Sequence, residues 1–260
     1  MIITDKIYNF SVKPNTLEMI VINSKYFQRL KYIHQKGFSY KITPLKHSRY
    51  EHSLGVFALS CKFNLSLEIR LVALLHDIAH GPFSHSLNFI FRSDHKIRSK
   101  DVIGDIFNNQ NFDKKVNKLN IYRYITGELK SPLRNGKIRS LSLDMLDNIL
   151  RDGYYAGYIK RSGIKFIINN IKIKNKDLLI KQDRFESMNS ILHKLNEKMY
   201  YSKDVMRYEN KMSGKAISAC IQGALDQVYD TWRTDEEIFK IISKFQCITV
   251  DQSRKLYLLK

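Results

Sequence analysis

The sequence predicts a mainly α-helical fold with small β-hairpin excursions in its C-terminal part. Apolar residues recur at helical spacing through most of residues 1–160, and serines that favour helix N-caps precede several of these segments. After Gly157 the pattern changes to isoleucine-rich runs that partly alternate with polar residues, which is typical of short strands. Because the chain has 260 residues, 43% of them apolar, it is long enough to bury a core of its own.

The first predicted helix begins after Ser24, a residue that caps helix N-termini well. Tyr26, Leu30 and Ile33 share one face of this helix, and Gly37 is a suitable stop. The pattern therefore predicts an amphipathic helix between these two signals.

Two longer helices follow in close succession. The second covers about residues 49–63. The third begins at Ser66 and is almost wholly apolar over residues 69–75, so we expect it to be central. Gly81 and Pro82 would end it.

Two further helices complete the N-terminal part. One is expected from Ser84 to Phe91, and the other carries apolar residues at helical spacing: Leu143, Leu146, Ile149 and Leu150. These helices would form a core domain over residues 1–158.

The remainder, residues 159–260, is expected to be an α+β extension packed on that core as one compact unit. Residues 164–174 read as a β-hairpin turning at Asn169 and Asn170. Helical patterning returns over about residues 184–230, and a last hairpin would pair residues 247–250 with 256–259.

Composition limits the class of protein. The formal charge of +19 is typical of a protein with a phosphate-rich partner, either nucleic acid or a small polyphosphate; a solvated lysine-rich surface is the alternative. The 12% aromatic content argues against disorder, and no apolar run is long enough to span a membrane. Three scattered cysteines without CxxC spacing, and no signal-peptide pattern, predict a reducing, cytoplasmic location.

Histidines concentrate in one part of the chain, since five of the eight lie between His52 and His95. If helices two and three form an antiparallel hairpin, His52 and His76 lie about 18 Å and about 15 Å above the connecting loop, at nearly the same level. His80 follows His76 at helical spacing, and Asp77 adds a carboxylate. The spacing therefore brings two imidazoles and one acid together.

This donor set suits Fe, Mn, Zn or Mg, and a fourth ligand would come from elsewhere. Asp144 is the best candidate because an acid within an apolar helix start is costly to bury without a partner. The alternative interpretation is that Asp144 and Asp147 are ordinary first-turn acids favoured by the helix dipole. For His76 the alternative is a hydrogen-bonded core histidine.

Four segments carry a family resemblance, and they are residues 27–37, 47–56, 75–85 and 144–157. In order and spacing they resemble the HD-domain phosphohydrolases, and within them the dNTP triphosphohydrolase branch. The resemblance implies an HD-domain helical bundle, a nucleotide substrate, a divalent metal cofactor and assembly into a homo-oligomer. The chain resembles a short version of the family with a trimmed C-terminal region.

The resemblance also implies residue roles. The metal ligands would be His52, His76, Asp77 and Asp144. The catalytic residues would be His80, His95 and Arg49, with Arg49 contacting phosphate. Substrate would further be contacted by Gln35 in the nucleoside pocket and by Asp152 and Tyr155 at the sugar.

Several positions depart from the triphosphohydrolase pattern. Met145 replaces a lysine that would bind phosphate, and Asn148 replaces an aromatic residue near the sugar. Lys36 follows Gln35 where an apolar residue is usual, and Asn88 replaces an aspartate that would support a catalytic histidine. These changes leave the expected metal ligands in place, so the sequence supports metal binding more firmly than dNTP hydrolysis.

Three functions remain open from the sequence. The first is a nucleotide phosphohydrolase that releases triphosphate from a dNTP, and the second is an HD-type nucleotidase or nuclease. The third is a nucleic-acid-binding or regulatory protein with a weakened site. Its contact face would be the basic stretch formed by Lys160, Arg161, Lys165, Lys172, Lys174, Lys176 and Lys181. The alternative for that stretch is an exposed, solvated hairpin.

Overall fold

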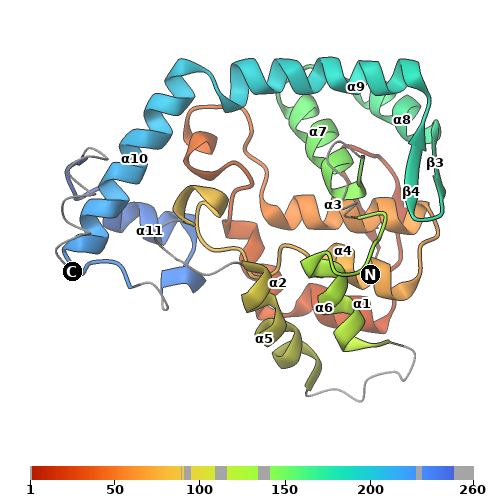
Figure 1. The fold of residues 1–260 in the computed structure, drawn as a ribbon, viewed down its shortest axis with the longest axis horizontal. Coiled ribbons are helices and arrows are strands. Elements are labelled where there is room, and N and C mark those ends of the chain that lie inside the picture. The colour runs from red at the N-terminus through yellow and green to blue at the C-terminus, as the bar shows by residue number, and fades with distance from the viewer. Residues whose placement is uncertain are drawn as a thin grey trace.

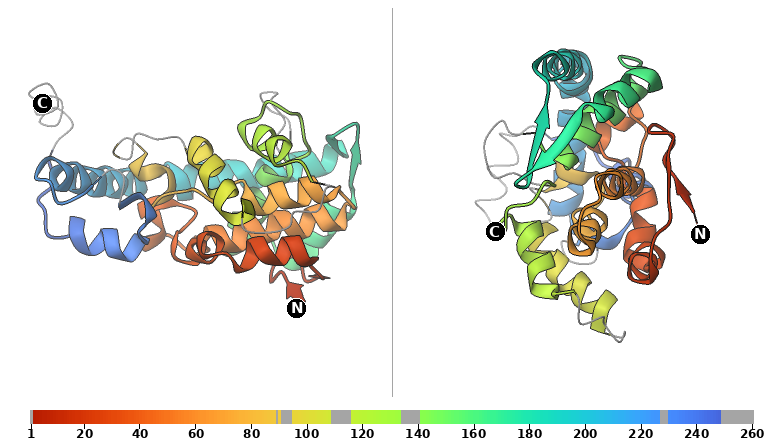
Figure 2. Two further views of the ribbon diagram at one scale, coloured as in Figure 1. Left: turned by 90° about the horizontal axis from the view of Figure 1, so that it is seen from below. Right: turned by 90° about the vertical axis from the view of Figure 1, so that its right-hand side faces the viewer.

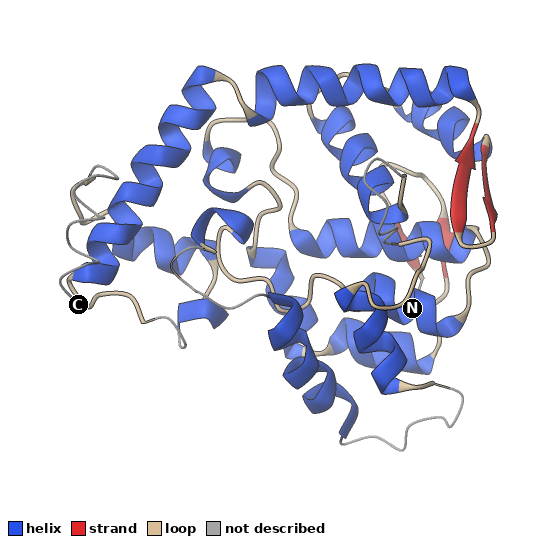
Figure 3. Cartoon of the chain, viewed as in Figure 1, coloured by secondary structure: helices blue, strands red, loops and turns tan. Residues whose placement is uncertain are grey.

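Helices form most of the described chain, and strands are confined to two short hairpins (Figure 1, Figure 3). The computed structural model describes residues 2–88, 90, 95–108, 116–133, 141–226 and 230–248. The predicted mainly helical fold with small hairpins is therefore confirmed.

The elements follow one another as short and medium helices. The α-helices are α1 (Thr16–Asn23), α2 (Lys25–Arg29), α3 (Arg49–Lys62), α4 (Leu67–Leu75), α5 (His95–Asn108), α6 (Lys118–Thr126), α7 (Leu143–Tyr155), α8 (Arg161–Asn169), α9 (Gln182–Leu195), α10 (Lys203–Ile221) and α11 (Asp235–Ile242). Tighter 3₁₀ turns are η1 (Leu30–Tyr32), η2 (Gly37–Lys41), η3 (Ser84–Leu87) and η5 (Asp230–Trp232), and η4 (Asn196–Tyr200) is a π-helical turn. The antiparallel hairpins pair β1 (Ile3–Thr4) with β2 (Ser11–Val12), and β3 (Ile171–Lys174) with β4 (Asp177–Ile180).

Side-chain caps define where α3 and α7 begin. The Ser48 hydroxyl accepts from the Glu51 amide while the Glu51 carboxylate accepts from the Ser48 amide, so a capping box opens α3. The Ser142 hydroxyl accepts from the Met145 amide at the start of α7. These caps hold the first turns of the two helices that carry His52 and Asp144.

The main core lies where α3 packs against both α4 and α7. Leu71, Leu74 and Leu75 of α4 have no exposed surface, so the prediction that this apolar helix is central is confirmed. Its burial places the residue that follows it, His76, deep in the molecule.

A second, smaller core joins α10 and α11 to η2 and to the segment after His80. Phe38, Phe83, Met212 and Ile238 are buried in it. Figure 2 shows an elongated molecule with α10 and α11 at one end and the β3–β4 hairpin at the other. The segments around residues 34–40 and 81–87 connect the two cores.

Several predicted helix boundaries were wrong. Ser24 does cap a helix, accepting from the Phe27 amide, but α2 ends at Arg29 and continues only as one 3₁₀ turn. The helix α4 ends at Leu75 rather than at Gly81, so His80 lies in a turn and not on a helical face with His76. From Ser84 only the short η3 forms, because Phe83 and Ser84 both adopt left-handed backbone angles; Phe91 lies outside the described residues.

The hairpin expected at residues 164–174 was placed too early. Residues 161–169 form α8 instead, because Ile164, Ile167 and Ile168 lie on one helical face and are buried together. The hairpin follows it, and its turn is made by Asn175 and Lys176, both with positive φ. The last hairpin, expected at residues 247–250 and 256–259, lies mostly outside the described residues.

Within the described part of the chain, no helix combines the length and apolar character needed to cross a bilayer.

Candidate metal centre

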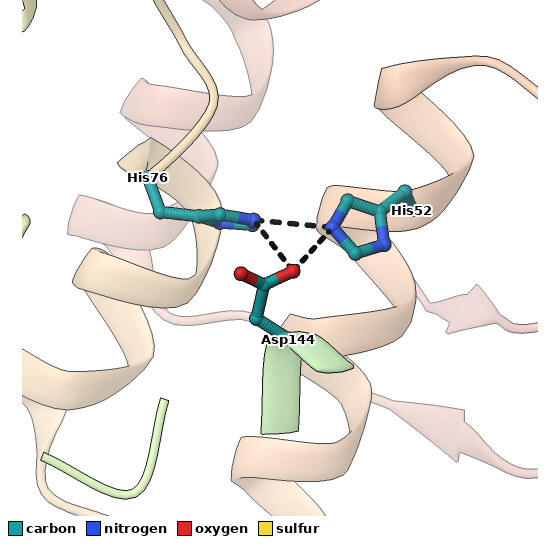
Figure 4. Close-up of side chains that lie close together, drawn as sticks. All are labelled: His52, His76 and Asp144. Carbon is teal, nitrogen blue, oxygen red and sulfur yellow. Dashed lines mark hydrogen bonds and ion pairs between the residues drawn. The ribbon is translucent and has the colours of Figure 1, made fainter. Parts of the chain in front are cut away.

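Three side chains converge from α3, from the end of α4 and from α7 (Figure 4). His52 lies on α3, His76 directly follows α4, and Asp144 lies in the first turn of α7. One donor atom from each lies within 4.8 Å of the other two. The Asp144 Oδ1 atom is 3.2 Å from His52 Nε2 and 4.0 Å from His76 Nε2.

Hydrogen bonds at the far side of each ring orient the two imidazoles. His76 Nδ1 lies 2.9 Å from the Ala73 carbonyl oxygen, which can only accept, so Nδ1 carries a proton. His52 Nδ1 lies 2.7 Å from Asp147 Oδ2. Both Nε2 atoms therefore point into the site, where they are 3.2 Å apart.

This arrangement favours a positive charge between the side chains. Burial lowers the pKa of His52, but its hydrogen bonds to Asp144 and Asp147 outweigh burial and raise that pKa to about 9. The pKa of Asp144 is lowered, since the neighbouring His52 and His76 outweigh its burial. Inward-facing imidazole nitrogens beside a carboxylate are a donor set that suits a divalent cation.

Asp77 lies beside the three converging side chains. Its Oδ2 atom is 3.6 Å from His76 Nε2 and 3.8 Å from His52 Nε2, and it also accepts from Arg49 Nη1. Burial opposes ionisation of Asp77, but the charges of Arg49, His76 and His80 hold its pKa well below the usual range. The carboxylate is therefore shared between the metal position and the Arg49 guanidinium.

Asp147 lies behind the candidate metal position, next to His52, and the sequence did not single it out for this place. It has no exposed surface and its carboxylate accepts from Arg151 Nε at 2.9 Å and Tyr8 OH at 2.5 Å. Arg151 also donates to Asp5 at 2.7 Å. The spacing of Asp147 and Arg151, one helical turn apart within an apolar helix, was the available signal.

Arg49 and His80 flank the candidate metal position. Arg49 is 2% exposed, and its Nε donates to Ser84 Oγ at 2.7 Å while Nη1 donates to Asp77. His80 Nε2 lies 3.4 Å from Asp77 Oδ1, and its ring meets the His85 ring edge-on. The structure thus brings together Arg49, His80 and the four expected ligands. His95 begins α5, but its side chain lies outside the described residues.

A cavity of about 470 Å³ opens beside this cluster. Its lining includes Gln35, Arg49, His85 and Asn148. The Asn148 amide donates to Asp144 Oδ1 at 2.9 Å and its carbonyl accepts from Gln35 at 3.1 Å. Asn148, at the position where an aromatic residue was expected, therefore links the cavity wall to Asp144. The volume of the cavity lies within the range usual for small-molecule sites.

Asp152 and Tyr155, the residues expected to face the sugar, have different hydrogen-bond partners. Asp152 has no exposed surface, and its carboxylate accepts from Tyr200 OH and from Lys36 Nζ at 2.6 Å. Tyr155 donates to Glu51 at 3.2 Å and stacks on His47. Lys36, Tyr200 and Glu209 all line the cavity. Asp152 therefore lies behind Lys36, and Lys36 is the residue that stands where an apolar side chain was expected.

The basic stretch singled out in the sequence lies on α8 and the β3–β4 hairpin. All seven of its basic residues are exposed, and Asp177, its one acid, pairs with Lys130 at 2.7 Å. Nucleic-acid binding by this face stays a prediction.

The fold and this cluster define a mainly helical protein with a candidate metal centre. Residues 49–148 match the HD domain family, a range that contains three of the four segments of the resemblance in whole or in part. This match confirms the HD-domain part of the resemblance.

Individual relatives extend this likeness. The chain is 26% identical to YdhJ, an uncharacterised protein of Bacillus subtilis, over 93% of this chain and 75% of that protein. It is 26% identical to the deoxynucleoside triphosphate triphosphohydrolase SAMHD1 homolog of Dictyostelium discoideum, over 87% of this chain and 49% of that protein. It is 36% identical to the uncharacterised protein MJ1154 of Methanocaldococcus jannaschii over 54% of this chain, which spans 31% of that protein.

A solved structure shares the fold. The crystal structure of a phosphohydrolase from Bacteroides thetaiotaomicron matches 99% of this chain and 73% of its own, with a TM-score of 0.66 and 20% sequence identity. The helical arrangement described above is therefore that of a known fold over nearly its whole length.

Proposed function

We propose that this protein is a divalent-metal-dependent nucleotide phosphohydrolase, whose substrate is a dNTP that it converts to a deoxynucleoside and triphosphate. One observation carries the proposal. Donor atoms of His52, His76 and Asp144 lie within 4.8 Å of one another, with the Asp77 carboxylate and the Arg49 guanidinium beside them. The similarity to the SAMHD1 homolog supports the choice of substrate class.

The side chains around this cluster have complementary roles. His52, His76, Asp77 and Asp144 would hold Mn, Fe, Mg or Zn, and the bound cation supplies Lewis-acid polarisation of a phosphoryl oxygen and activation of water. Arg49 presents a guanidinium, whose planar donors suit phosphate oxygens. His80, close to Asp77, is the group suited to donate a proton to the leaving oxygen; His95 is assigned a similar role by the resemblance alone.

The neighbouring cavity would hold the rest of the nucleotide. Gln35 and Asn148 offer amide groups on one wall, and Tyr200 and Tyr201 offer aromatic surface on another. By the resemblance Asp152 and Tyr155 would act at the sugar end. Asp152 would do so through Lys36 and Tyr200, which cover its carboxylate and line the cavity. Their assignment as substrate residues remains a proposal.

Turnover measurements test the function directly. The purified protein, supplied with Mn²⁺ or Mg²⁺, is offered the four dNTPs, and products are separated by anion-exchange chromatography. We expect triphosphate release, and we expect Asp77→Ala to abolish it by weakening metal binding. The control is Asp204→Ala, which alters an aspartate on α10 whose side chain is 89% exposed. Full turnover in Asp77→Ala would contradict the proposal.

An HD-type nucleotidase or nuclease is the second candidate. Met145 is 37% exposed near Asp144 and offers no charge to a triphosphate, where a phosphate-binding lysine was expected. The products distinguish the two activities, because only the first releases triphosphate. Release of inorganic phosphate from monophosphates, or shortening of single strands, would favour the second.

A further inference from the structure

The segment that follows His80 is held in place from the far end of the molecule. Asp235 is the first residue of α11, which Figure 1 shows beside α10 at the end away from the β3–β4 hairpin. Its side chain is 1% exposed and contacts the segments at residues 34 and 83. None of the roles proposed above uses this buried carboxylate.

Asp235 accepts hydrogen bonds from two separate segments. Its Oδ1 accepts from the Phe83 amide at 2.6 Å. Its Oδ2 accepts from the His34 amide at 2.8 Å and lies 2.9 Å from His34 Nδ1. One carboxylate therefore ties residues 83 and 34 together, although they are far apart in sequence.

These two segments meet at the hydroxyl that orients Arg49. Ser84 Oγ donates to the His34 carbonyl at 2.5 Å and accepts from Arg49 Nε at 2.7 Å. Asp235 thus holds Phe83, the residue before Ser84, and also His34, whose carbonyl accepts from Ser84. The guanidinium of Arg49 is fixed by this hydroxyl on one side and by Asp77 on the other.

The backbone at this point needs such support. Phe83 and Ser84 have φ values of 53° and 54°, in the left-handed region that side-chain-bearing residues seldom adopt. Conformations of this kind are energetically unfavourable and persist only where surrounding contacts hold them. The bond from the Phe83 amide to Asp235, and the packing of Phe83 against Phe239 of α11, are contacts of that kind.

We propose that Asp235 is a positioning residue, which acts through Ser84 and His34 to hold the Arg49 guanidinium in the orientation that binds phosphate. This inference rests on the proposed phosphohydrolase function. It makes α11 part of the active-site structure, although α11 contributes no group that would touch substrate.

The test compares Asp235→Asn with Glu236→Gln in the 260-residue chain. Glu236 is the next residue of α11, and its side chain is 57% exposed. We expect Asp235→Asn to lower kcat/KM by about 10- to 100-fold, because small misplacements of a binding group have effects of that size. We expect its Mn²⁺ affinity to stay within about twofold of the wild type, since no metal ligand contacts Asp235. The Glu236→Gln variant should match the wild type in both measurements.

A double-mutant cycle separates positioning from a general structural effect. Ser84→Ala should reproduce the loss, and adding Asp235→Asn to it should cost less than about threefold more. Wild-type kcat/KM in Asp235→Asn, or a full multiplicative loss in the double variant, would overturn the proposal. If Asp235→Asn does not fold, wild-type kcat/KM in Ser84→Ala would overturn it equally.

A measurement without turnover keeps this inference distinct from the proposed function. Amide hydrogen exchange in Asp235→Asn should accelerate at Phe83 and His34 but not in α4. If the wild type hydrolyses no nucleotide, the proposed function is refuted. Accelerated exchange in Asp235→Asn would then still support the tethering by Asp235. Unchanged exchange at both amides would refute the tethering whatever the activity.

Discussion

Replacing Asp147 with asparagine should destabilise the protein and weaken its metal site together. Asp147 has no exposed surface, and the carboxylate accepts from Arg151, from Tyr8 and from His52. Removing one partner of a buried ion pair costs about 3–5 kcal/mol because the other charge is left uncompensated. Here Asp5 still accepts from Arg151 at 2.7 Å, so we expect the lower end, about 3 kcal/mol.

Urea denaturation and thermal melting followed by circular dichroism measure this loss. For a chain of this length about 3 kcal/mol corresponds to a fall in Tm of about 6–12 °C. The matched control is Asp183→Asn, because Asp183 also pairs with an arginine, at 2.9 Å, but its side chain is 59% exposed. The control should change the free energy of unfolding by less than about 0.5 kcal/mol.

The same variant tests whether Asp147 orients His52. A residue that holds a metal-ligating imidazole through its second nitrogen affects metal affinity by about 10- to 100-fold when it is replaced. Mn²⁺ titration should show this loss in Asp147→Asn and not in Asp183→Asn. A loss of stability below about 1 kcal/mol would refute the buried-charge reasoning, and an unchanged Mn²⁺ affinity would refute the orienting role.

Three further predictions concern stability. Burial lowers the pKa of His47 to about 3, against about 6.5 in the unfolded chain. Between these two pH values the unfolded state binds more protons than the folded state, so acidification from pH 6.5 toward pH 3 should destabilise the fold. His47→Asn should remove about 1.4 kcal/mol per pH unit from this dependence in urea titrations at pH 6.5, 5.5 and 4.5, and parallel profiles would contradict the assignment. Lys176→Gly should stabilise the hairpin turn by about 0.5–1 kcal/mol because φ there is 66°, and a loss of stability would show that the lysine side chain matters more. Gly55→Ala should destabilise by about 2–3 kcal/mol, since its Cβ would lie 2.0 Å from Arg151 Nη2; unchanged urea denaturation would mean that Arg151 can move away.

Local sequence signals predicted the elements that depend on one segment. The apolar run at residues 69–75 predicted α4, because burial of an apolar helix depends on the pattern within a single segment. The segment at residues 164–174 was misread for a related reason. Isoleucines at that spacing fit both a strand and a helical face, and only packing of Ile164 and Ile167 in the main core favours the helix.

The candidate site divides in the same way. His76 and Asp77 are adjacent and follow an apolar helix, so their burial near the centre could be predicted from the sequence. An antiparallel hairpin of the second and third predicted helices also puts His52 at the same level as His76, and the two Nε2 atoms are 3.2 Å apart. Asp144 joined the set only as the best candidate for a fourth ligand, since no local pattern ties α7 to α3.

The supporting contacts could not be predicted from the sequence. For Asp147 the sequence offered only the alternative of an acid favoured by the helix dipole. Asp235 lies more than 150 residues after the segment that it holds. A hydrogen bond between such residues leaves no periodic pattern, because it depends on where two cores place their surfaces.

The sequence by itself determined that the chain is helical, that it has an apolar central helix and that histidines and acids gather around that helix. These features follow from local periodicity and from chemistry within short segments. Only the tertiary structure decided which carboxylates lie behind the metal position, that Lys36 covers Asp152, and that α11 holds the segment orienting Arg49. The physical reason is that buried charges need partners, and the fold brings those partners from distant parts of the chain.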